Sequence, residues 1–382
     1  MANNNYRMCS RCILDTTVPR IRFDDDGTCN YCKMHDKFEQ KYPLSELGEK
    51  RLKEQIEEIR RKGKKKRYDC IIGISGGTDS TYCLYLAKKW GLRPLAVHLD
   101  NEWDSDIAIN NIKRSVEKLG VSLKLVRVDW EEFKDLQVAF LKASVPDMEI
   151  PTDIAIYATL FKIAAEENIP SVVNGHSFRT EGTAPLGWTY MDGRYIKSVY
   201  KKFGKKKKLE NFPNLKISNL LYYVLIKRIK EYRPLEYIDY DKQEAGKELE
   251  KKFEWKYYGG HHYESIYTRF VTSYILVKKF SIDKRKVSLS ALVRTGKMIR
   301  EEALEEISEK PYPDDKTKED MDYVLKKLGL SKEVFEEIMS SPAKSFLDYQ
   351  TYYTLIRKFR FFIKMACKLG LVPEILYEKY AK

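Results

Sequence analysis

The chain has 382 residues, 43% of them hydrophobic, and a mean hydropathy of -0.53. Lys and Arg number 70 against 56 Asp and Glu, so the net charge of +14 favours anionic partners such as nucleic acid, nucleotides or acidic sugars. No apolar run approaches the roughly 20 residues of a spanning helix, and the first residues lack the hydrophobic core of a signal peptide. These features exclude a protein built on spanning helices, and we expect a globular cytoplasmic protein.

Two CxxC turns stand near the N-terminus, Cys9–Cys12 and Cys29–Cys32, with sixteen residues between them. Four thiolates at this spacing are typical of a closed, tetrahedral structural zinc site. An iron–sulfur cluster uses the same four sulfurs and stays an alternative, whereas two disulfides conflict with a cytoplasmic protein. The segment that contains the four cysteines is too short to bury a hydrophobic core. The bound metal must therefore supply the folding energy of this segment. We expect His35 to be a solvated residue at a helix start.

The segment after the cysteines is strongly charged. Residues 36–63 carry leucines and isoleucines at helical spacing and predict one long helix. Residues 63–67, Gly-Lys-Lys-Lys-Arg, predict a solvated basic connector rather than a nucleic-acid patch.

A buried strand and a glycine turn then follow. Residues 70–74 form an apolar run typical of a buried parallel strand, and residues 81–89 continue with helical periodicity. Strand, glycine turn and helix N-terminus together direct backbone N–H groups and the helix dipole at an anion. Gly76 and Gly77 allow a phosphate to approach the main chain. Asp79 is suited to a magnesium ion bridging phosphate oxygens, and hydroxyl donors come from Ser75, Thr78 and Ser80.

The turn itself, Ser-Gly-Gly-Thr-Asp-Ser at residues 75–80, resembles the SGGxDS signature of the PP-loop ATP pyrophosphatases. No lysine follows the glycines, so the turn is not a GxxxxGK[ST] loop. The resemblance implies cleavage of ATP between the α- and β-phosphates, with Mg²⁺ as cofactor, so that an acceptor oxygen becomes adenylylated.

Strands and helices continue to alternate, which predicts an α/β fold with a doubly wound parallel sheet. We expect strands at 94–99, 122–128, 171–174 and 233–238, and helices at 104–119, 130–143 and 154–167. Ligands bind at the carboxyl ends of such strands, where the strand order reverses. This rule gathers one ATP-binding set: Ser75, Gly76, Gly77, Thr78, Asp79, Ser80, Asp100, Asn101 and Gly175.

The sequence Asn-Gly-His-Ser at 174–177 follows the fourth expected strand and looks like a second glycine–histidine element of the PP-loop families. Glu181, in the same loop, is a candidate second metal or substrate carboxylate. We predict four catalytic residues, Asp79, Ser80, His176 and Glu181. An ordinary strand-end turn with a locally satisfied His176 is the alternative.

Residues 257–265 combine aromatic, glycine and histidine residues that suit sugars and phosphates. His261, His262 and Glu264 suggest a metal triad, but adjacent histidines are expected to point in different directions. Residues 290–304 predict helix, glycine cap and helix. The aromatic residues of the tail are expected to lie in the core: Phe346, Tyr349, Tyr352, Tyr353, Phe359, Phe361 and Phe362.

Four features occur together: the four-cysteine leader, the 75–80 turn, the stretch Ile-Pro-Thr-Asp at 150–153, and Asn-Gly-His-Ser-Phe-Arg-Thr-Glu-Gly at 174–182. With the basic helical tail, including residues 278–304, the chain is similar to the N-acetyl sugar amidotransferases of bacterial surface-polysaccharide biosynthesis. The similarity implies conversion of an acetamido group on an acidic sugar to an acetamidino group. A UDP-linked diacetamido mannuronic acid is preferred over a nonulosonate, and the exact sugar stays open.

The same resemblance implies a separate glutaminase and a cyclase-like barrel of the histidine-pathway class, which supply ammonia. Position 2 is alanine, so no N-terminal cysteine nucleophile follows Met1. Two alternatives remain, a PP-loop tRNA-thiolating enzyme and a non-catalytic nucleotide-binding scaffold. We expect a zinc-binding module (1–36), a helical basic linker (37–67), a PP-loop nucleotide-binding domain (68–255) and a helical C-terminal substrate or partner domain (256–382).

Overall fold

The computed structural model describes residues 6–369 and 377–381. Its centre is a five-stranded sheet with the order β3-β2-β1-β4-β5, in which every neighbouring pair is parallel. The strands are β1 (Cys70–Gly73), β2 (Pro94–Asp100), β3 (Ser122–Arg127), β4 (Ser171–Val173) and β5 (Lys230–Tyr232). The chain moves outward from β1 to β3 and then returns to β4 on the other side, so the doubly wound α/β prediction is confirmed and the strand order reverses between β1 and β4.

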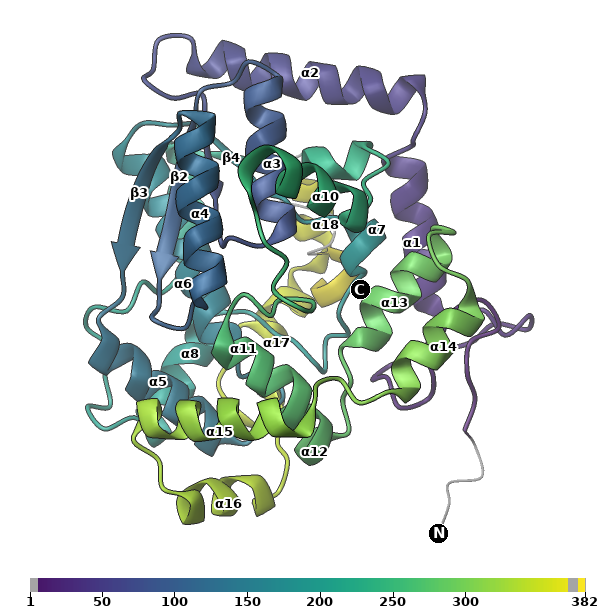
Figure 1. Ribbon diagram of the computed structural model, residues 1–382, viewed down its shortest axis with the longest axis vertical. Coiled ribbons are helices and arrows are strands. Elements are labelled where there is room, and N and C mark those ends of the chain that lie inside the picture. The colour runs from purple at the N-terminus through teal and green to yellow at the C-terminus, as the bar shows by residue number, and fades with distance from the viewer. Residues whose placement is uncertain (1–5, 370–376, 382) are drawn as a thin grey trace.

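Helices cover both faces of this sheet (Figure 1). Successive strand residues point to opposite faces, so Ile72 packs with α3 (Thr78–Lys89), α4 (Asp106–Leu119) and α2 (Glu46–Gly63), whereas Ile71 packs with α6 (Ile150–Glu166). Both isoleucines are fully buried. Burial on both faces explains why β1 has a continuous apolar sequence.

Helices also gather at the two ends of the strands (Figure 1). Helix α2 crosses above the amino ends, while α11 (Ile266–Phe270), α12 (Leu276–Phe280) and α15 (Asp314–Leu328) lie beyond the carboxyl ends. Between α4 and α11 the chain also forms α5 (Trp130–Ala143), α7 (Phe178–Glu181), α8 (Gly193–Phe203), α9 (Ile217–Leu221), η1 (Tyr222–Ile226), η2 (Pro234–Tyr237) and α10 (Lys242–Phe253). Within the described residues, no helix is both long and apolar enough to cross a membrane.

The prediction of one helix over residues 36–63 is wrong. Two helices occur instead, α1 (Asn30–Lys41) and α2, joined by a short connector that contains Pro43. Proline lacks an N–H and disfavours the helical conformation of the residue before it, so the first helix ends at this point. The helical spacing of the leucines and isoleucines was correct for α2 but does not extend across the proline.

The prediction of a fifth strand at residues 233–238 is also wrong. The strand is β5, which ends one residue before Arg233, and residues 234–237 form the 3-10 turn η2. Pro234 fixes φ and has no N–H to give to a sheet, so it starts the turn after the strand.

The C-terminal region is helical, as expected. Its elements are α11 (Ile266–Phe270), η3 (Val271–Ile275), α12 (Leu276–Phe280), α13 (Arg285–Arg294), α14 (Arg300–Ser308), α15 (Asp314–Leu328), α16 (Lys332–Ser340), η4 (Phe346–Asp348), α17 (Tyr353–Lys358), α18 (Arg360–Lys368) and η5 (Tyr377–Ala381). Gly296, between α13 and α14, has a φ of +72°, which suits the predicted glycine cap.

The aromatic residues of the tail divide into two groups. Phe346, Tyr349 and Tyr353 are buried, Tyr352 is half-buried, and Phe346 stacks on Tyr190 with ring centroids 4.3 Å apart. Phe361 and Phe362 are 66% and 64% exposed, and Phe359 is also exposed, so their predicted core position is wrong. The rings near residue 350 meet α8 and its flanking loop, whereas within the described residues those at 359–362 contact mainly each other.

Candidate functional site

The 75–80 turn joins β1 to the N-terminus of α3, and its two glycines have different requirements. Gly76 has a φ of +77°, and a Cβ there would lie 2.4 Å from the carbonyl oxygen of Ala108. Gly77 has a φ of -75°, which any residue adopts, and a Cβ there would lie 3.0 Å from Oε1 of Glu264. Gly76 is therefore required by the fold, whereas Gly77 leaves room for the side chains of Ser75, Tyr258 and Glu264 to approach the helix N-terminus.

The turn is held by side chains from within and from behind. Ser80 Oγ accepts a hydrogen bond from Ser75 N at 3.2 Å and lies 3.2 Å from Ser75 Oγ. The carbonyl of Gly76 accepts hydrogen bonds from Trp255 Nε1 at 2.9 Å and Asn111 Nδ2 at 3.1 Å. These bonds fix the direction of the peptide groups, so the protein itself holds the turn in one conformation.

Asp79 lies on the first turn of α3 and is bound by two residues that sequence reasoning missed. Tyr240 donates its hydroxyl to Oδ1 at 2.6 Å, and Lys242 Nζ lies 2.6 Å from Oδ2. Burial acts to raise the pKa of Asp79, but Lys242 and Tyr240 outweigh it and lower the pKa. The carboxylate is therefore charged, and its role in holding magnesium stays a prediction. No motif marks Tyr240 or Lys242, which are more than 160 residues from Asp79 in sequence.

The loop after β4 reaches the same place. A Cβ on Gly175 would lie 2.8 Å from the carbonyl oxygen of Asp79, so only glycine allows this close approach. His176 Nε2 lies 3.4 Å from Glu181, and its Nδ1 lies 3.7 Å from Glu236. The structure thus brings the loops after β1 and β4 together, as the switch-point rule predicts.

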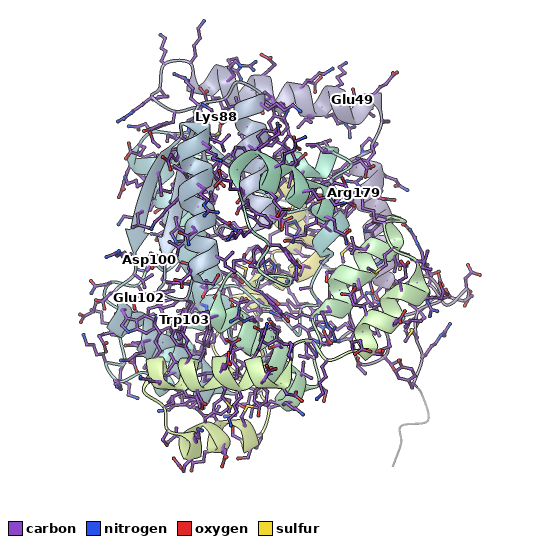
Figure 2. The ribbon with its side chains drawn as sticks, in the orientation of Figure 1. Glu49, Lys88, Asp100, Glu102, Trp103 and Arg179 are labelled. Atoms are coloured by element: carbon purple, nitrogen blue, oxygen red, sulfur yellow. The ribbon has the colours of Figure 1, made fainter. Side chains whose placement is uncertain are left out.

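The two residues expected at the end of β2 lie differently. Asp100 pairs with Arg127 of β3 at 3.0 Å and caps its own turn by accepting from the N–H of Glu102. Figure 2 labels Asp100, Glu102 and Trp103 at this end of β2. Asn101 accepts from the N–H of Trp103 at 3.2 Å. Both side chains stabilise the turn after β2, and a direct contact with ATP stays a prediction.

His98 is a further residue that sequence reasoning missed. Its Nδ1 lies 2.8 Å from the carbonyl oxygen of Ile74, and its Nε2 lies 3.1 Å from Asp104. Burial alone would lower the pKa of His98, but Asp104 reverses this and raises it. The imidazole therefore supports the residue directly before the 75–80 turn. It lies in an apolar strand, where a histidine gives no separate signal.

Residues 258–264, at the start of the C-terminal region, contact the 75–80 turn. Tyr258 Oη accepts a hydrogen bond from the N–H of Thr78 at 3.3 Å, and Ser75 Oγ donates to Oε1 of Glu264 at 3.3 Å. His261 and His262 have ring centroids 4.0 Å apart, so the expectation that they point in different directions is wrong. His262 has a left-handed φ of +60°, which breaks the alternation of side chains along an extended chain. Together with Glu181, they offer ligand atoms within 4.8 Å of one another.

Three carboxyl groups at the start of α6 and just before it are buried, and burial raises their pKa values. Burial raises the pKa of Glu149 to about 7, despite its hydrogen bond from Thr268. It also raises the pKa of Asp147 to about 7, although Tyr195 donates to that carboxyl at 2.8 Å. The pKa of Asp153 rises for the same reason, and Lys284 opposes the rise.

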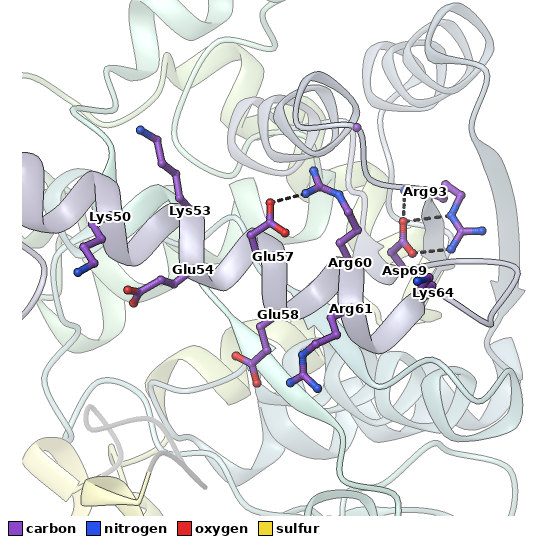
Figure 3. A pocket seen from close by; sticks show the side chains of 11 residues that line it. Lys50, Lys53, Glu54, Glu57, Glu58, Arg60, Arg61, Lys64, Asp69 and Arg93 are labelled. Carbon is purple, nitrogen blue, oxygen red and sulfur yellow. Dashed lines mark hydrogen bonds and ion pairs between the residues drawn. The ribbon is translucent and has the colours of Figure 1, made fainter.

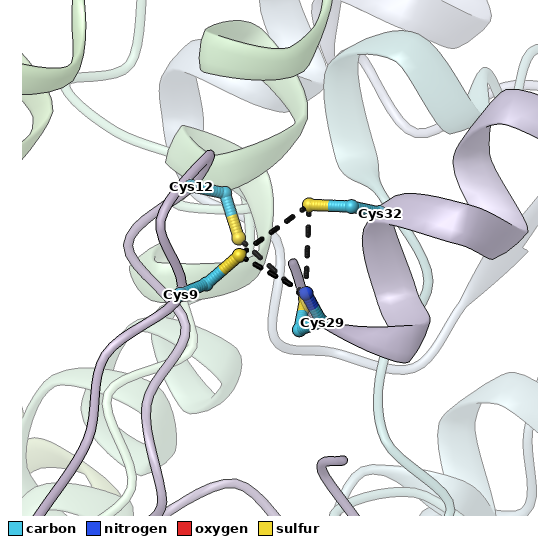
Figure 4. A group of neighbouring side chains, drawn as sticks. All are labelled: Cys9, Cys12, Cys29 and Cys32. Atoms are coloured by element: carbon cyan, nitrogen blue, oxygen red, sulfur yellow. Dashed lines mark hydrogen bonds between the residues drawn. The ribbon is translucent and has the colours of Figure 1, made fainter. Parts of the chain in front are cut away.

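The four cysteines form a separate, closed centre (Figure 4). All four are fully buried, and neighbouring sulfurs lie 3.6–3.8 Å apart. A single tetrahedral ion with metal–sulfur bonds of about 2.3 Å requires sulfur–sulfur distances of about 3.8 Å, so the residues fit such an ion. Arg294 donates from Nε to Cys32 at 3.2 Å and from Nη2 to Cys12 at 3.3 Å. A [4Fe–4S] cluster binds each cysteine to a different iron and would hold all the sulfurs further apart, whereas a [2Fe–2S] cluster binds two cysteines to each iron.

His35 connects the four-cysteine centre to α7 in the loop after β4. The prediction that this histidine is solvated is wrong. The side chain is 3% exposed, and its ring meets the edge of Phe178 at 5.0 Å. Next to it, the buried Arg179 donates to the carbonyls of Tyr42 and Glu236, both at 2.6 Å. The N-terminal module therefore packs directly on α7, which carries Glu181.

A groove of about 970 Å³ along α2 lies away from these residues (Figure 3). Charged side chains line it and pair with one another, as in Arg60–Glu57 and Arg93–Asp69, both at 2.6 Å. Asp69 precedes β1, so the groove is at the amino ends of the strands, opposite to where ligands of such sheets bind. We place the functional site at the carboxyl ends.

Two protein-family descriptions match the chain. "Queuosine biosynthesis protein QueC" matches residues 69–158, and "LPS biosynthesis protein WbpG-like, C-terminal domain" matches residues 264–364. The first range contains the 75–80 turn, and the second begins at Glu264, which contacts that turn.

Curated relatives match part of the chain. An uncharacterised protein from Methanocaldococcus jannaschii is 30% identical over 132 residues, 33% of this chain and 45% of that protein. A tRNA-specific 2-thiouridylase from Fusobacterium nucleatum is 26% identical over 113 residues, 28% of this chain and 33% of that enzyme. The chain thus spans less than half the length of these relatives.

Solved structures show a weaker likeness. The tRNA thiolase NcsA from Methanococcus maripaludis, with its [4Fe-4S] cluster, has a TM-score of 0.31 and 16% identity, covering 78% of this chain and 88% of that one. The NH3-dependent NAD synthetase from Campylobacter jejuni has a TM-score of 0.28 and 16% identity, covering 54% and 93%. The two family matches, the parallel sheet and the 75–80 turn together identify the chain as a WbpG-type member of the PP-loop ATP pyrophosphatases, a superfamily of ATP-using enzymes.

Proposed function

We propose that the protein is an ATP-dependent amidotransferase of surface-glycan (LPS O-antigen) biosynthesis. It converts an acetamido group of an acidic, UDP-linked N-acetyl sugar to an acetamidino group. One observation carries the proposal: Glu264, the first residue of the WbpG-like region, contacts the proposed ATP-binding turn, with its Oε1 3.3 Å from Ser75 Oγ. A sugar held by that region therefore meets the nucleotide where an adenylyl group is transferred.

The reaction needs activation because an amide carbon is a poor electrophile and its oxygen a poor leaving group. The acetamido oxygen attacks the α-phosphorus of ATP and pyrophosphate leaves. Ammonia then attacks the activated carbon, and AMP leaves with the original oxygen. The amides of the 75–80 turn and the N-terminus of α3 stabilise the phosphate charge. Bound Mg²⁺, held by Asp79, would neutralise the pyrophosphate. Ser80 fixes the turn, and His176 and Glu181 lie beside it for proton transfer.

An acidic substrate suits the charge near the site. A groove of about 550 Å³ runs between the N-terminal module and the chain after Gly182, with Thr183, Ala184 and Leu186 on one side. Its basic side chains include Arg20, Arg22 and Lys33. A nucleotide sugar carries phosphate and carboxylate groups, which such cations attract.

Ammonia is proposed to come from a separate glutaminase through a cyclase-like barrel of the histidine-pathway class. The four cysteines are proposed to hold a structural zinc ion, because four protein thiolates leave no open position for chemistry. Neither partner nor metal identity affects the assignment of the ATP site.

The test is product analysis with ATP, ammonium and a small panel of acetamido sugars. We expect AMP and pyrophosphate in amounts equal to an acetamidino product that is one mass unit lighter than the sugar. Asp79→Ala is expected to reduce pyrophosphate release by at least ~10²-fold, with the metal at the cysteines retained. Formation of ADP in place of AMP would contradict the proposal.

A tRNA-thiolating enzyme is the second candidate, favoured by the partial match to a tRNA 2-thiouridylase. Sulfur transfer by such chemistry needs an accessible cysteine near the nucleotide. Cys70 and Cys83 are fully buried in β1 and α3, and burial raises the pKa of both thiols. Incubation with tRNA, ATP and sulfide separates the candidates, since a thiolated nucleoside would support the second one.

A further inference from the structure

The loop after β4 and the 259–262 turn meet at a cluster of metal-ligand type. One ligand atom from each of Glu181, His261 and His262 lies within 4.8 Å of the others, and His262 Nε2 is 3.9 Å from Glu181 Oε1. Bonds to a divalent transition metal of about 2.0–2.2 Å need ligand atoms roughly 3.4 Å apart. Small side-chain rotations are enough to close this difference, and the His262 side chain is 49% exposed.

Outer groups already orient two of the three candidate ligands. His262 presents Nε2 to Glu181 and Nδ1 to Glu264, at 3.8 Å. Glu181 presents its second oxygen to His176 Nε2 at 3.4 Å. Ligand histidines of metal sites commonly direct their far nitrogen at a carboxylate, which fixes the ring and increases its basicity. Glu264 is only 9% exposed, and its Oε2 has no hydrogen-bond partner within the described residues.

The local charge favours a cation. Lys242 Nζ lies 3.3 Å from Nδ1 of His261, which leaves Nε2 of that ring for a metal. Its ammonium is matched by Asp79 at 2.6 Å. Among the described residues, the ion-pair contacts of Glu181 and Glu264 are to histidines, whose neutral rings bind metals. Two imidazoles and one carboxylate suit Zn²⁺, Mn²⁺, Fe²⁺ or Co²⁺ better than Mg²⁺, which prefers oxygen ligands.

We propose that Glu181, His261 and His262 form a second metal site, for a divalent transition metal, beside the 75–80 turn. It is distinct from the magnesium position proposed at Asp79 and from the four cysteines. Three protein ligands leave coordination positions for ligands from outside the protein, which is the arrangement of catalytic rather than structural sites. Glu264 and His176 are positioning residues, and Glu264 joins the site to Ser75.

The test uses the full chain with zinc bound at the cysteines and Co²⁺ as the probe, without ATP or sugar. We expect one additional Co²⁺ per chain, with weak visible bands and without the strong near-ultraviolet sulfur-to-cobalt charge transfer that a cysteine site gives. His261→Ala and His262→Ala are each expected to weaken this binding at least ~100-fold, and Glu264→Gln about 10-fold. Tyr257→Phe and Glu254→Gln, on the same stretch of chain, are matched controls that should bind like the natural protein.

Mn²⁺ paramagnetic resonance on the natural protein gives a second measurement, since Mn²⁺ avoids thiolates. One bound Mn²⁺ that Co²⁺ displaces is expected. Absence of any additional Co²⁺ or Mn²⁺, or binding that survives both histidine substitutions, overturns the proposal. Because no sugar or ATP is present, the outcome is independent of the amidotransferase assignment.

Discussion

The four-cysteine centre and the residue cluster at the carboxyl ends of β1 and β4 both concentrate ionisable groups, but the hydrogen-bonding capacity of these groups is met to different extents. At the cysteines, every sulfur is buried, and Arg294 donates directly to two of them. In the cluster at the carboxyl ends, Asp79 shares Lys242 with His261, and Oε2 of Glu264 has no hydrogen-bond partner within the described residues. A closed, fully coordinated cluster contributes stability, whereas an open one with unmet hydrogen-bonding capacity binds ligands.

The largest expected effect breaks the closed centre. Cys29→Ser removes one ligand of four, and because metal binding supplies the folding energy of a small module, we expect the free energy of unfolding to fall by about 5 kcal/mol or more. Metal analysis and thermal unfolding measure the change. Cys367→Ser, on α18, is the control and should keep the metal. If Cys29→Ser folds normally without metal but loses activity, the metal is more than structural.

The two glycines of the 75–80 turn are expected to differ in their effect, with Gly76 needed for stability and Gly77 for the proposed ATP binding. Gly76→Ala places a Cβ against the backbone of Ala108 at a left-handed φ, so a loss of about 3 kcal/mol of stability is expected. Gly77→Ala has an ordinary φ and meets only side chains, so the fold should persist, with ATP binding weakened at least ~10-fold by the filled cradle.

Calorimetry with ATP and thermal unfolding, run on both glycine variants, distinguish these effects. The same loss of stability in both variants would contradict the assignment of Gly77 to ligand binding.

Arg294 tests whether the closed centre depends on its outer hydrogen bonds. Arg294→Gln removes both N–H···S bonds, and we expect metal affinity to fall 10- to 100-fold, measured by competition with a chelator. The matched control is Arg300→Gln, because that guanidinium bonds the carbonyls of Cys9 and Cys12 and no cysteine sulfur. Equal losses in both variants would show that the arginines act only by joining the module to α13 and α14.

The smallest expected effect is a change of stability with pH that comes from the buried carboxyl of Glu149. In the folded chain the pKa of Glu149 is about 7, against a usual value of 4.5. Between these values the folded chain holds a proton that the unfolded chain has lost, so this stabilisation is complete below pH 4.5 and is lost as the pH rises through 7. We expect the free energy of unfolding to fall by about 2 kcal/mol between pH 5 and 8 from this group.

Chemical denaturation across this pH range checks the Glu149 prediction, with Glu149→Gln as the variant. The substitution should flatten the profile, leaving the part of the slope that Asp147 contributes with the same sign. A profile that is unchanged by Glu149→Gln would contradict the raised pKa.

The sequence by itself determined the elements that rest on local signals. The apolar run before the 75–80 turn, the alternation of strands and helices and the two CxxC turns predicted the sheet, the loop positions and the cysteine centre, because strand burial, glycine turns and thiolate spacing act over a few residues. Local reasoning failed where it ignored a proline, as at Pro43 and Pro234, or assumed side-chain alternation, as at His261 and His262.

Only the tertiary structure decided which distant residues complete the site. Tyr240, Lys242 and Glu264 reach the 75–80 turn from 160 or more residues away in sequence, and His35 is buried because α7 packs over it. Such contacts depend on how the C-terminal helices and the N-terminal module close over the end of the sheet. Packing of this kind is set by the whole chain and leaves no periodic or spaced pattern in any one segment.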